Sequence, residues 1–155
     1  MDGGNQFLAE KIFVYRSKVN WKKEKIGILV FEEKPEIVFT IPKEFGGEEN
    51  FLTPEDLFLA SINACVLTSF LYFSKIFQLK ILSYTSTAEG TIKKVGEPYV
   101  FTEVNIKPII EVETKEEKEK AVKVMETAKK HCVVSKSVEG KVNVIIQPTI
   151  RIRGE

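Results

Sequence analysis

The feature that most constrains this chain is the run from Leu57 to Ser74, which contains no charged side chain. A helix-start signature precedes the run, with Thr53 placed as the N-cap and Pro54 at the first helical position. Two carboxylates follow, where they interact favourably with the positive end of the helix dipole. The sequence therefore predicts a helix over residues 53–78. Because its side chains are apolar all round, this helix has to be buried on all sides.

The same run is just long enough to be considered as a membrane span. Polar side chains occur along it, and strand-like segments on both sides need a packed core: Ser61, Asn63, Thr68, Ser69 and Ser74 are the polar residues. We therefore expect the central helix of a soluble fold and no membrane partner.

Length and composition favour one globular domain spanning residues 1–155, with a loose tail at 1–10, since 43% of the residues are apolar and 29% are charged. A net charge of +1 gives no general electrostatic reason to expect nucleic acid as a partner. Two cysteines do not make a secreted disulfide framework, and the first residues lack the apolar run of a signal peptide. We therefore expect a cytoplasmic protein. In that reducing compartment a cysteine pair is more often redox-active than structural.

Apolar periodicity predicts three strands, the central helix, two strands, a second helix and a closing strand. The strands fall at residues 11–19, 25–31, 36–41, 80–93, 99–112 and 141–152, with a basic turn at 20–24, a glycine-containing loop at 42–52 and a helical turn at 133–138. The order β-β-β-α-β-β-α-β predicts an α+β fold with antiparallel sheets around the central helix.

Two features give the second half of the chain more detail. Thr114 and Glu117 form a capping box that starts the second helix, whose apolar stripe leads on to Cys132. The stripe consists of Ala121, Val124, Met125 and Ala128. Alternation in the strand 99–112 puts four residues on one face, Val100, Thr102, Val104 and Ile106, and Gly90 allows a bulge in the strand before it.

The two cysteines are the candidate reactive groups. A thiol reacts as the thiolate, which a nearby cation stabilises. Cys65 lies too far into its helix to benefit from the N-terminal dipole, so a side chain from elsewhere has to supply the charge. The candidates in the first hairpin are Arg16, Lys22, Lys23 and Lys25. The alternatives are two inert buried thiols, or a zinc site formed by His131 with both cysteines.

The segment TPEDLFLASINAC resembles the helix opening N-P-E-x-L…A-x-x-A-C of the OsmC/Ohr family, and KKHCVVSKSV resembles its second cysteine motif, C-P-V-S. The resemblance covers nearly the whole chain. It implies an intertwined homodimer, with two central helices back to back and strands of both chains wrapped around them.

The resemblance also implies a thiol-dependent peroxidase that reduces organic hydroperoxides without a metal or an organic cofactor. Cys65 would become a sulfenic acid, Cys132 would resolve it to a disulfide, and an external dithiol would reduce that disulfide. The family's acidic residue matches Glu49 best, with Glu48 as a second possibility. The family's arginine in the first hairpin turn is missing from WKKEK, so Lys23 or Lys25 takes its place, or Arg16 reaches in from the strand.

Two other functions fit the same fold. One is a non-catalytic module that binds an apolar ligand, and the missing turn arginine favours it. The other is a thiol redox sensor or carrier, which would form a disulfide without rapid consumption of peroxide.

Overall fold

The computed structural model describes residues 10–155, and the chain divides into two compact units. The first ends at Pro54 and the second spans Glu55–Glu155, and each is described by itself. The expected loose tail falls outside the described residues except at Glu10. The predicted α+β architecture is confirmed.

The first unit is a three-stranded antiparallel sheet in the order β1-β2-β3. Its elements are β1 (Lys18–Lys23), β2 (Ile26–Val30), β3 (Ile37–Phe39) and the 3-10 turn η1 (Lys43–Phe45). The expected strand at 11–19 is wrong, since residues 11–17 are irregular and β1 runs through most of the expected turn. The chain reverses instead at Glu24, which has a φ of 45°, and Trp21 Nε1 donates to its carbonyl oxygen at 3.0 Å.

The expected loop at 42–52 is present, and both glycines have a physical reason to be there. Gly46 has a φ of 83°, in the left-handed region that favours glycine. A Cβ on Gly47 would lie 1.7 Å from the carbonyl oxygen of Ile41, so no side chain fits. The loop returns to the sheet where the Thr40 N–H donates to the Leu52 carbonyl oxygen at 2.9 Å.

The second unit contains a four-stranded sheet in which β4 (Ser83–Lys94) and β5 (Tyr99–Val112) form a long antiparallel hairpin. The expected single closing strand is two strands, β6 (Asn143–Ile146) and β7 (Thr149–Ile152). Both pair with β5 in parallel, which departs from the expected antiparallel sheets. The break falls at Pro148, which has no N–H to donate to a ladder. The parallel direction follows from the helical crossover that returns the chain to the start of β5.

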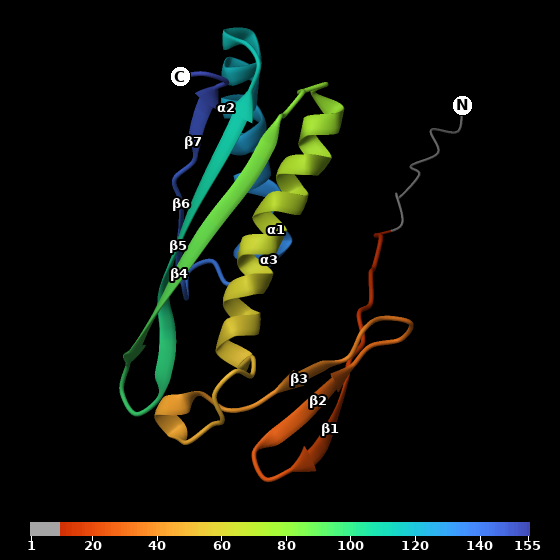
Figure 1. Cartoon of the computed structure of the whole chain (residues 1–155), viewed down its shortest axis with the longest axis vertical. Coiled ribbons are helices and arrows are strands. Elements are labelled where there is room, and N and C mark those ends of the chain that lie inside the picture. Colours follow the sequence, from red (N-terminus) through yellow and green to blue (C-terminus); the bar gives the residue numbers. More distant parts are fainter. Residues whose placement is uncertain (1–9) are drawn as a thin grey trace, which may run out of the picture. The chain divides into compact units, whose positions relative to one another are not determined.

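Three helices complete this unit: α1 (Pro54–Ile76), α2 (Lys115–His131) and α3 (Val133–Ser137). Alternate residues of β5 are buried from Val104 to Val112, and they share one core cluster with α1 and with the predicted stripe of α2. Both long helices therefore cover the same face of the sheet, as Figure 1 shows for α1 beside β4 and β5.

Within this chain α1 is buried on one face only, so the expected burial of its other faces stays a prediction. The buried residues recur every fourth position: Ile62, Val66, Phe70 and Ser74. Large apolar side chains near its C-terminal end are exposed: Leu71, Tyr72, Ile76 and Phe77. By length and composition alone α1 would be long and apolar enough to cross a membrane, but its buried stripe packs into the core of the second unit.

A β-bulge changes the predicted alternation in β5. Thr91 pairs with Glu103 and Ile92 pairs with Phe101, so Thr102 is an extra residue on its strand. Phe101 consequently points to the core and stacks on the Phe58 ring at 4.5 Å, whereas Val100 is exposed, against the prediction that it shares the face of Val104.

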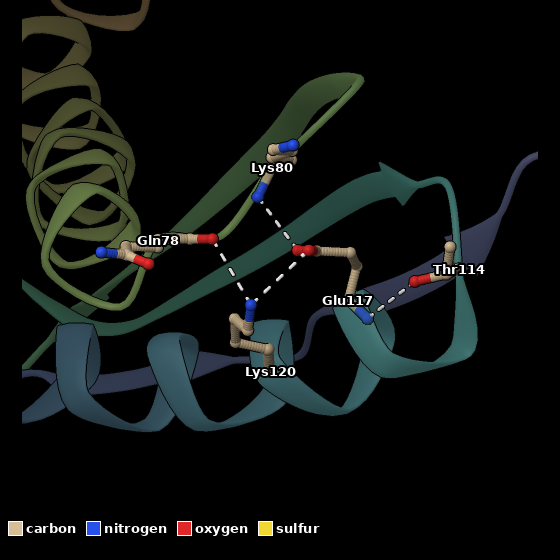
Figure 2. Close-up of polar contacts among 5 residues, drawn as sticks. All are labelled: Gln78, Lys80, Thr114, Glu117 and Lys120. Atoms are coloured by element: carbon tan, nitrogen blue, oxygen red, sulfur yellow. Dashed lines mark hydrogen bonds and ion pairs between the residues drawn. The ribbon is translucent and has the colours of Figure 1, made fainter.

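Polar contacts join the end of α1 to the start of α2 (Figure 2). The Glu117 N–H donates to Thr114 Oγ1 at 3.1 Å, which confirms Thr114 as the predicted cap. The other half of the predicted capping box is not formed, because the Glu117 side chain turns to other partners. The Glu117 carboxylate accepts from the Lys80 N–H at 3.0 Å and pairs with Lys120 at 3.5 Å. Lys120 Nζ also donates to the Gln78 carbonyl oxygen at 3.4 Å. Glu117 and Lys120 thus connect the start of α2 to the residues that follow α1.

Helix α1 ends in a Schellman motif. The Leu79 N–H donates to the Ser74 carbonyl oxygen at 2.8 Å, and the Gln78 N–H donates to that of Lys75 at 3.3 Å. Gln78 has a φ of 53°, at a position where glycine is the usual residue.

Candidate functional site

The two cysteines meet in the core of the second unit although they are far apart in the sequence. Cys65 lies on α1 and is half-buried, and Cys132 joins α2 to α3 and is fully buried. Both thiols are free, and the Cys65 side chain is among the groups that act on the ionisation of Cys132. The structure therefore brings together the two sulfur atoms that the sequence singled out.

Local sequence explains the position of Cys132. The apolar stripe of α2 ends at Ala128, and Cys132 continues it one turn later in an extended conformation with φ −68° and ψ 105°. This residue ends α2 and begins α3, so its side chain stays in the core while the backbone changes direction. One turn further on, Ser135 is also buried and its hydroxyl donates to Cys132 Sγ at 3.0 Å.

The surroundings of Cys132 have opposing effects on its ionisation. Burial is the largest influence and raises the pKa of the thiol, because a buried thiolate loses its hydration. The hydroxyl and the backbone N–H of Ser135 oppose this by donating hydrogen bonds to the sulfur. The nearby Cys65 raises the Cys132 pKa further, through a hydrogen bond between the two side chains and through repulsion between their charged forms. The net result is a pKa above the ordinary value.

The other predicted site residues all belong to the first unit. Arg16 lies in the irregular stretch before β1, Lys23 is the last residue of β1, and Lys25 is in the turn between β1 and β2. Lys25 Nζ donates to the carbonyl oxygen of Gly46 at 3.0 Å, which ties the first hairpin to the glycine loop. The catalytic roles of these three cations stay predictions.

Glu49 lies in the same glycine loop and forms an ion pair with Lys43. The side chains of Lys43 and Glu49 are 72% and 65% exposed, so the pair contributes little to stability. Lys43 was not among the expected cations, which were all placed in the first hairpin. The role of Glu49 at the thiol also stays a prediction.

The structure adds a carboxylate that sequence reasoning used only as a dipole partner. Glu55 is in the first turn of α1, and its Oε2 is buried without a hydrogen-bond partner among residues 10–155. A buried carboxylate oxygen without a donor is costly, so this atom is suited to a cation from another segment. An acidic residue directly after Pro54 was the available signal.

A cleft of about 600 Å³ opens beside Ser135, between the end of α2, α3 and the start of β6. The charged side chains along it are Lys129, Lys136, Glu139 and Lys141. Ser135 thus both contacts the buried sulfur and belongs to the lining of the cleft. No pattern in the sequence indicates this cleft, because its residues come from α2, α3, β5 and β6.

The zinc alternative is not found in the part of the chain that the structure describes. No three His, Cys, Asp or Glu side chains come together there in a way that suits a metal ion. His131 is exposed and packs its ring against Phe73, with 5.2 Å between the ring centroids.

Solved structures resemble this fold along nearly its whole length. An OsmC-like protein of Vibrio cholerae has a TM-score of 0.77 at 19% identity, with 89% of this chain and 100% of that one covered. The organic hydroperoxide resistance protein OsmC of Legionella pneumophila has a TM-score of 0.74 at 18% identity, with 90% and 99% covered. An organic hydroperoxide resistance protein of Elizabethkingia anophelis has a TM-score of 0.72 at 22% identity, also with 90% and 99% covered. At these identities the likeness shows the fold.

A search of curated proteins returns no match. The sequence from residue 46 to residue 147 matches the family model for OsmC-like proteins, and this range includes α1, both cysteines and the hairpin of β4 and β5. The predicted resemblance is thereby confirmed, and the chain belongs to the family of OsmC-like proteins.

Proposed function

We propose that this protein is a homodimeric, cytoplasmic thiol peroxidase that reduces organic hydroperoxides with Cys65 and Cys132. The observation that carries the proposal is the meeting of the two free thiols, the half-buried Cys65 and the fully buried Cys132, in one core. Family membership supports the same chemistry, since two structural neighbours are organic hydroperoxide resistance proteins.

The difference in burial assigns a role to each sulfur. A peroxide has to reach the attacking thiolate, and Cys65 is the less buried of the two. Its thiolate attacks the peroxide O–O bond, so that the sulfur is oxidised to sulfenic acid and the alkoxide leaves and takes up a proton. The Cys132 thiol then attacks the sulfenic sulfur, the disulfide forms and water leaves. An external dithiol reduces the disulfide and completes the cycle.

The activating cation comes, in this proposal, from Lys23, Lys25 or Arg16. Lysine supplies a point charge without the bidentate geometry of arginine. Glu49 or Glu55 orients this cation, and the buried unpartnered oxygen of Glu55 favours the latter. Ten residues separate Glu55 from Cys65, about 15 Å along a helix, so a cation with a long side chain has to span the interval.

The homodimer accounts for the exposed apolar end of α1. A second copy that packs against Leu71, Tyr72 and Ile76 removes apolar surface that the single chain leaves exposed. Light scattering coupled to gel filtration should give the mass of two chains. A monomer across the working concentration range would contradict this part of the proposal.

Turnover of cumene hydroperoxide with dithiothreitol tests the catalytic part. Cys65→Ser should abolish turnover and the trapping of sulfenic acid by dimedone. Cys132→Ser should retain one attack and then accumulate sulfinic acid, detected by mass spectrometry. Ser137→Ala is the matched control, because among residues 10–155 this exposed hydroxyl bonds only the carbonyl of Val133 in the same helix. Full activity of Cys65→Ser would refute the peroxidase assignment and leave the ligand-binding module as the better reading.

A further inference from the structure

The hydrogen bond between Ser135 and Cys132 is specific and buried. The two side chains are 9% and 0% exposed, and 3.0 Å separates Ser135 Oγ from Cys132 Sγ. A hydroxyl can accept from a thiol and donate to a thiolate, so the contact suits both states of the sulfur. It is stronger when the sulfur is charged. Cys65 has no hydroxyl donor to its sulfur among the hydrogen bonds of the described residues: its carbonyl accepts from Thr68, and its side chain contacts that of Cys132.

We propose that Ser135 is a positioning residue that makes Cys132 the leaving group when an external dithiol reduces the Cys65–Cys132 disulfide. The inference rests on the pairing of sulfurs in the proposed function and deepens it, since it assigns the direction of the reductive step. Two observations support it: the reductant reaches Cys65 more easily because that sulfur is less buried, and Ser135 contacts the other sulfur.

The reductive step then has a fixed order. One thiolate of the dithiol attacks Cys65 Sγ, the Cys65–Cys132 bond breaks, and its electron pair goes to Cys132 Sγ. The second thiol of the reductant attacks the mixed disulfide, which releases the Cys65 thiolate and a cyclic disulfide. Two protons from the dithiol end on the two protein sulfurs. Exchange is slower when the leaving thiolate is poorly stabilised, and burial raises the pKa of Cys132. The hydrogen bonds from Ser135 lower that pKa and so offset part of the penalty on the departing Cys132 sulfur.

Ser135 also connects the buried sulfur to solvent. Cys132 Sγ has no exposed surface, yet it has to gain a proton after reduction and lose one when the disulfide forms. The Ser135 hydroxyl contacts this sulfur, and Ser135 is one of the residues that line the cleft beside α3, with Lys136 and Lys141. A hydroxyl at this position can pass a proton between the sulfur and water in the cleft.

The test separates this step from peroxide chemistry. The disulfide is formed with diamide, the oxidant is removed, and reduction by dithiothreitol is followed by acid quench, alkylation and mass spectrometry. Ser135→Ala should slow reduction about three- to tenfold. Ser135→Thr retains the hydroxyl and should stay within about twofold of the wild type. Ser137→Ala, on the same short helix, should not change the rate.

A second measurement uses only the wild-type protein, so it does not depend on the folding of a variant. The oxidised protein is treated briefly with 2-mercaptoethanol, and the adduct is mapped by peptide mass. The adduct should lie on Cys65. An adduct on Cys132, an unchanged rate in Ser135→Ala, or no disulfide with diamide would each overturn the proposal. A disulfide that forms with diamide but not with peroxide would refute the peroxidase function and leave the role of Ser135 standing.

Discussion

The contacts of Glu117 between α2 and the residues after α1 should contribute measurably to the free energy of unfolding. Its carboxylate is 16% exposed, accepts from the Lys80 N–H at 3.0 Å and pairs with Lys120 at 3.5 Å. A hydrogen bond to a charged group contributes about 1.5 to 3 kcal/mol, and a partly exposed ion pair adds about 0.5 kcal/mol. Lys80 itself is exposed, so water can take over part of the lost bond. We therefore expect Glu117→Ala to lower the free energy of unfolding by about 2 kcal/mol.

The matched control is Glu116→Ala. Glu116 is also in the first turn of α2, so both variants lose the same favourable interaction with the helix dipole, about 0.3 to 1 kcal/mol. Glu116 is exposed, and no bond to Lys80 or Lys120 is found for it, so the difference between the variants isolates those contacts. Glu117→Gln keeps an acceptor for the Lys80 N–H and should lose about half as much as Glu117→Ala.

Urea unfolding followed by far-ultraviolet circular dichroism measures these differences at one fixed protein concentration, because dimerisation would make stability depend on concentration. Equal midpoints for Glu117→Ala and Glu116→Ala would show that the carboxylate contributes only through the dipole. The reasoning from the Lys80 and Lys120 contacts would then be refuted.

Three further substitutions have expected outcomes that the same unfolding assay can check. Gln78→Gly should stabilise the protein by about 1 kcal/mol, because it removes the strain of a left-handed residue, whereas Gln147→Gly, at an ordinary φ, should not stabilise it. Gly90→Ala should cost about 1 to 3 kcal/mol, because the new Cβ would lie 2.7 Å from the Phe101 ring, and Phe101→Leu in the same chain should recover part of the loss. Burial raises the pKa of Cys132, so its contribution to stability is complete below the ordinary thiol value of 9.0 and declines as pH rises through the folded pKa. Cys132→Ala should therefore flatten the alkaline fall in stability.

The sequence predicted those parts of the fold that depend on local periodicity and caps. Thr114 begins α2 as its capping side chain indicated, and Pro54 begins α1. The stripe of α2 also led correctly to a buried Cys132. These features are local, because each depends on residues within a few turns of one helix.

The errors arose where distant segments decide the outcome. The extra residue at Thr102 reverses the faces of β5, and nothing in its own strand announces it. The parallel pairing of β6 depends on where α2 returns the chain. The position of β1 depends on its register with β2, in which Trp21 lies opposite Gly27. Alternation alone cannot choose among such registers.

For the candidate site, the sequence identified both sulfurs but neither Ser135 nor the buried oxygen of Glu55. Serine and glutamate are common surface residues, and only their burial marks them. The partner of Glu49 was missed for a related reason, since Lys43 is one of many lysines in the chain.

The two short strands at the end of the chain have a consequence for its synthesis. They lie one after the other along a single edge of β5, where Asn143–Ile146 covers residues 103–106 and Thr149–Ile152 covers residues 109–112. On the ribosome this edge stays open until Ile152 has emerged, with its backbone N–H and C=O groups free to pair with another nascent chain. A protein truncated before Asn143 would keep α1, α2 and the β4–β5 hairpin and still expose that edge permanently. Premature termination is therefore expected to yield aggregates rather than a smaller folded protein.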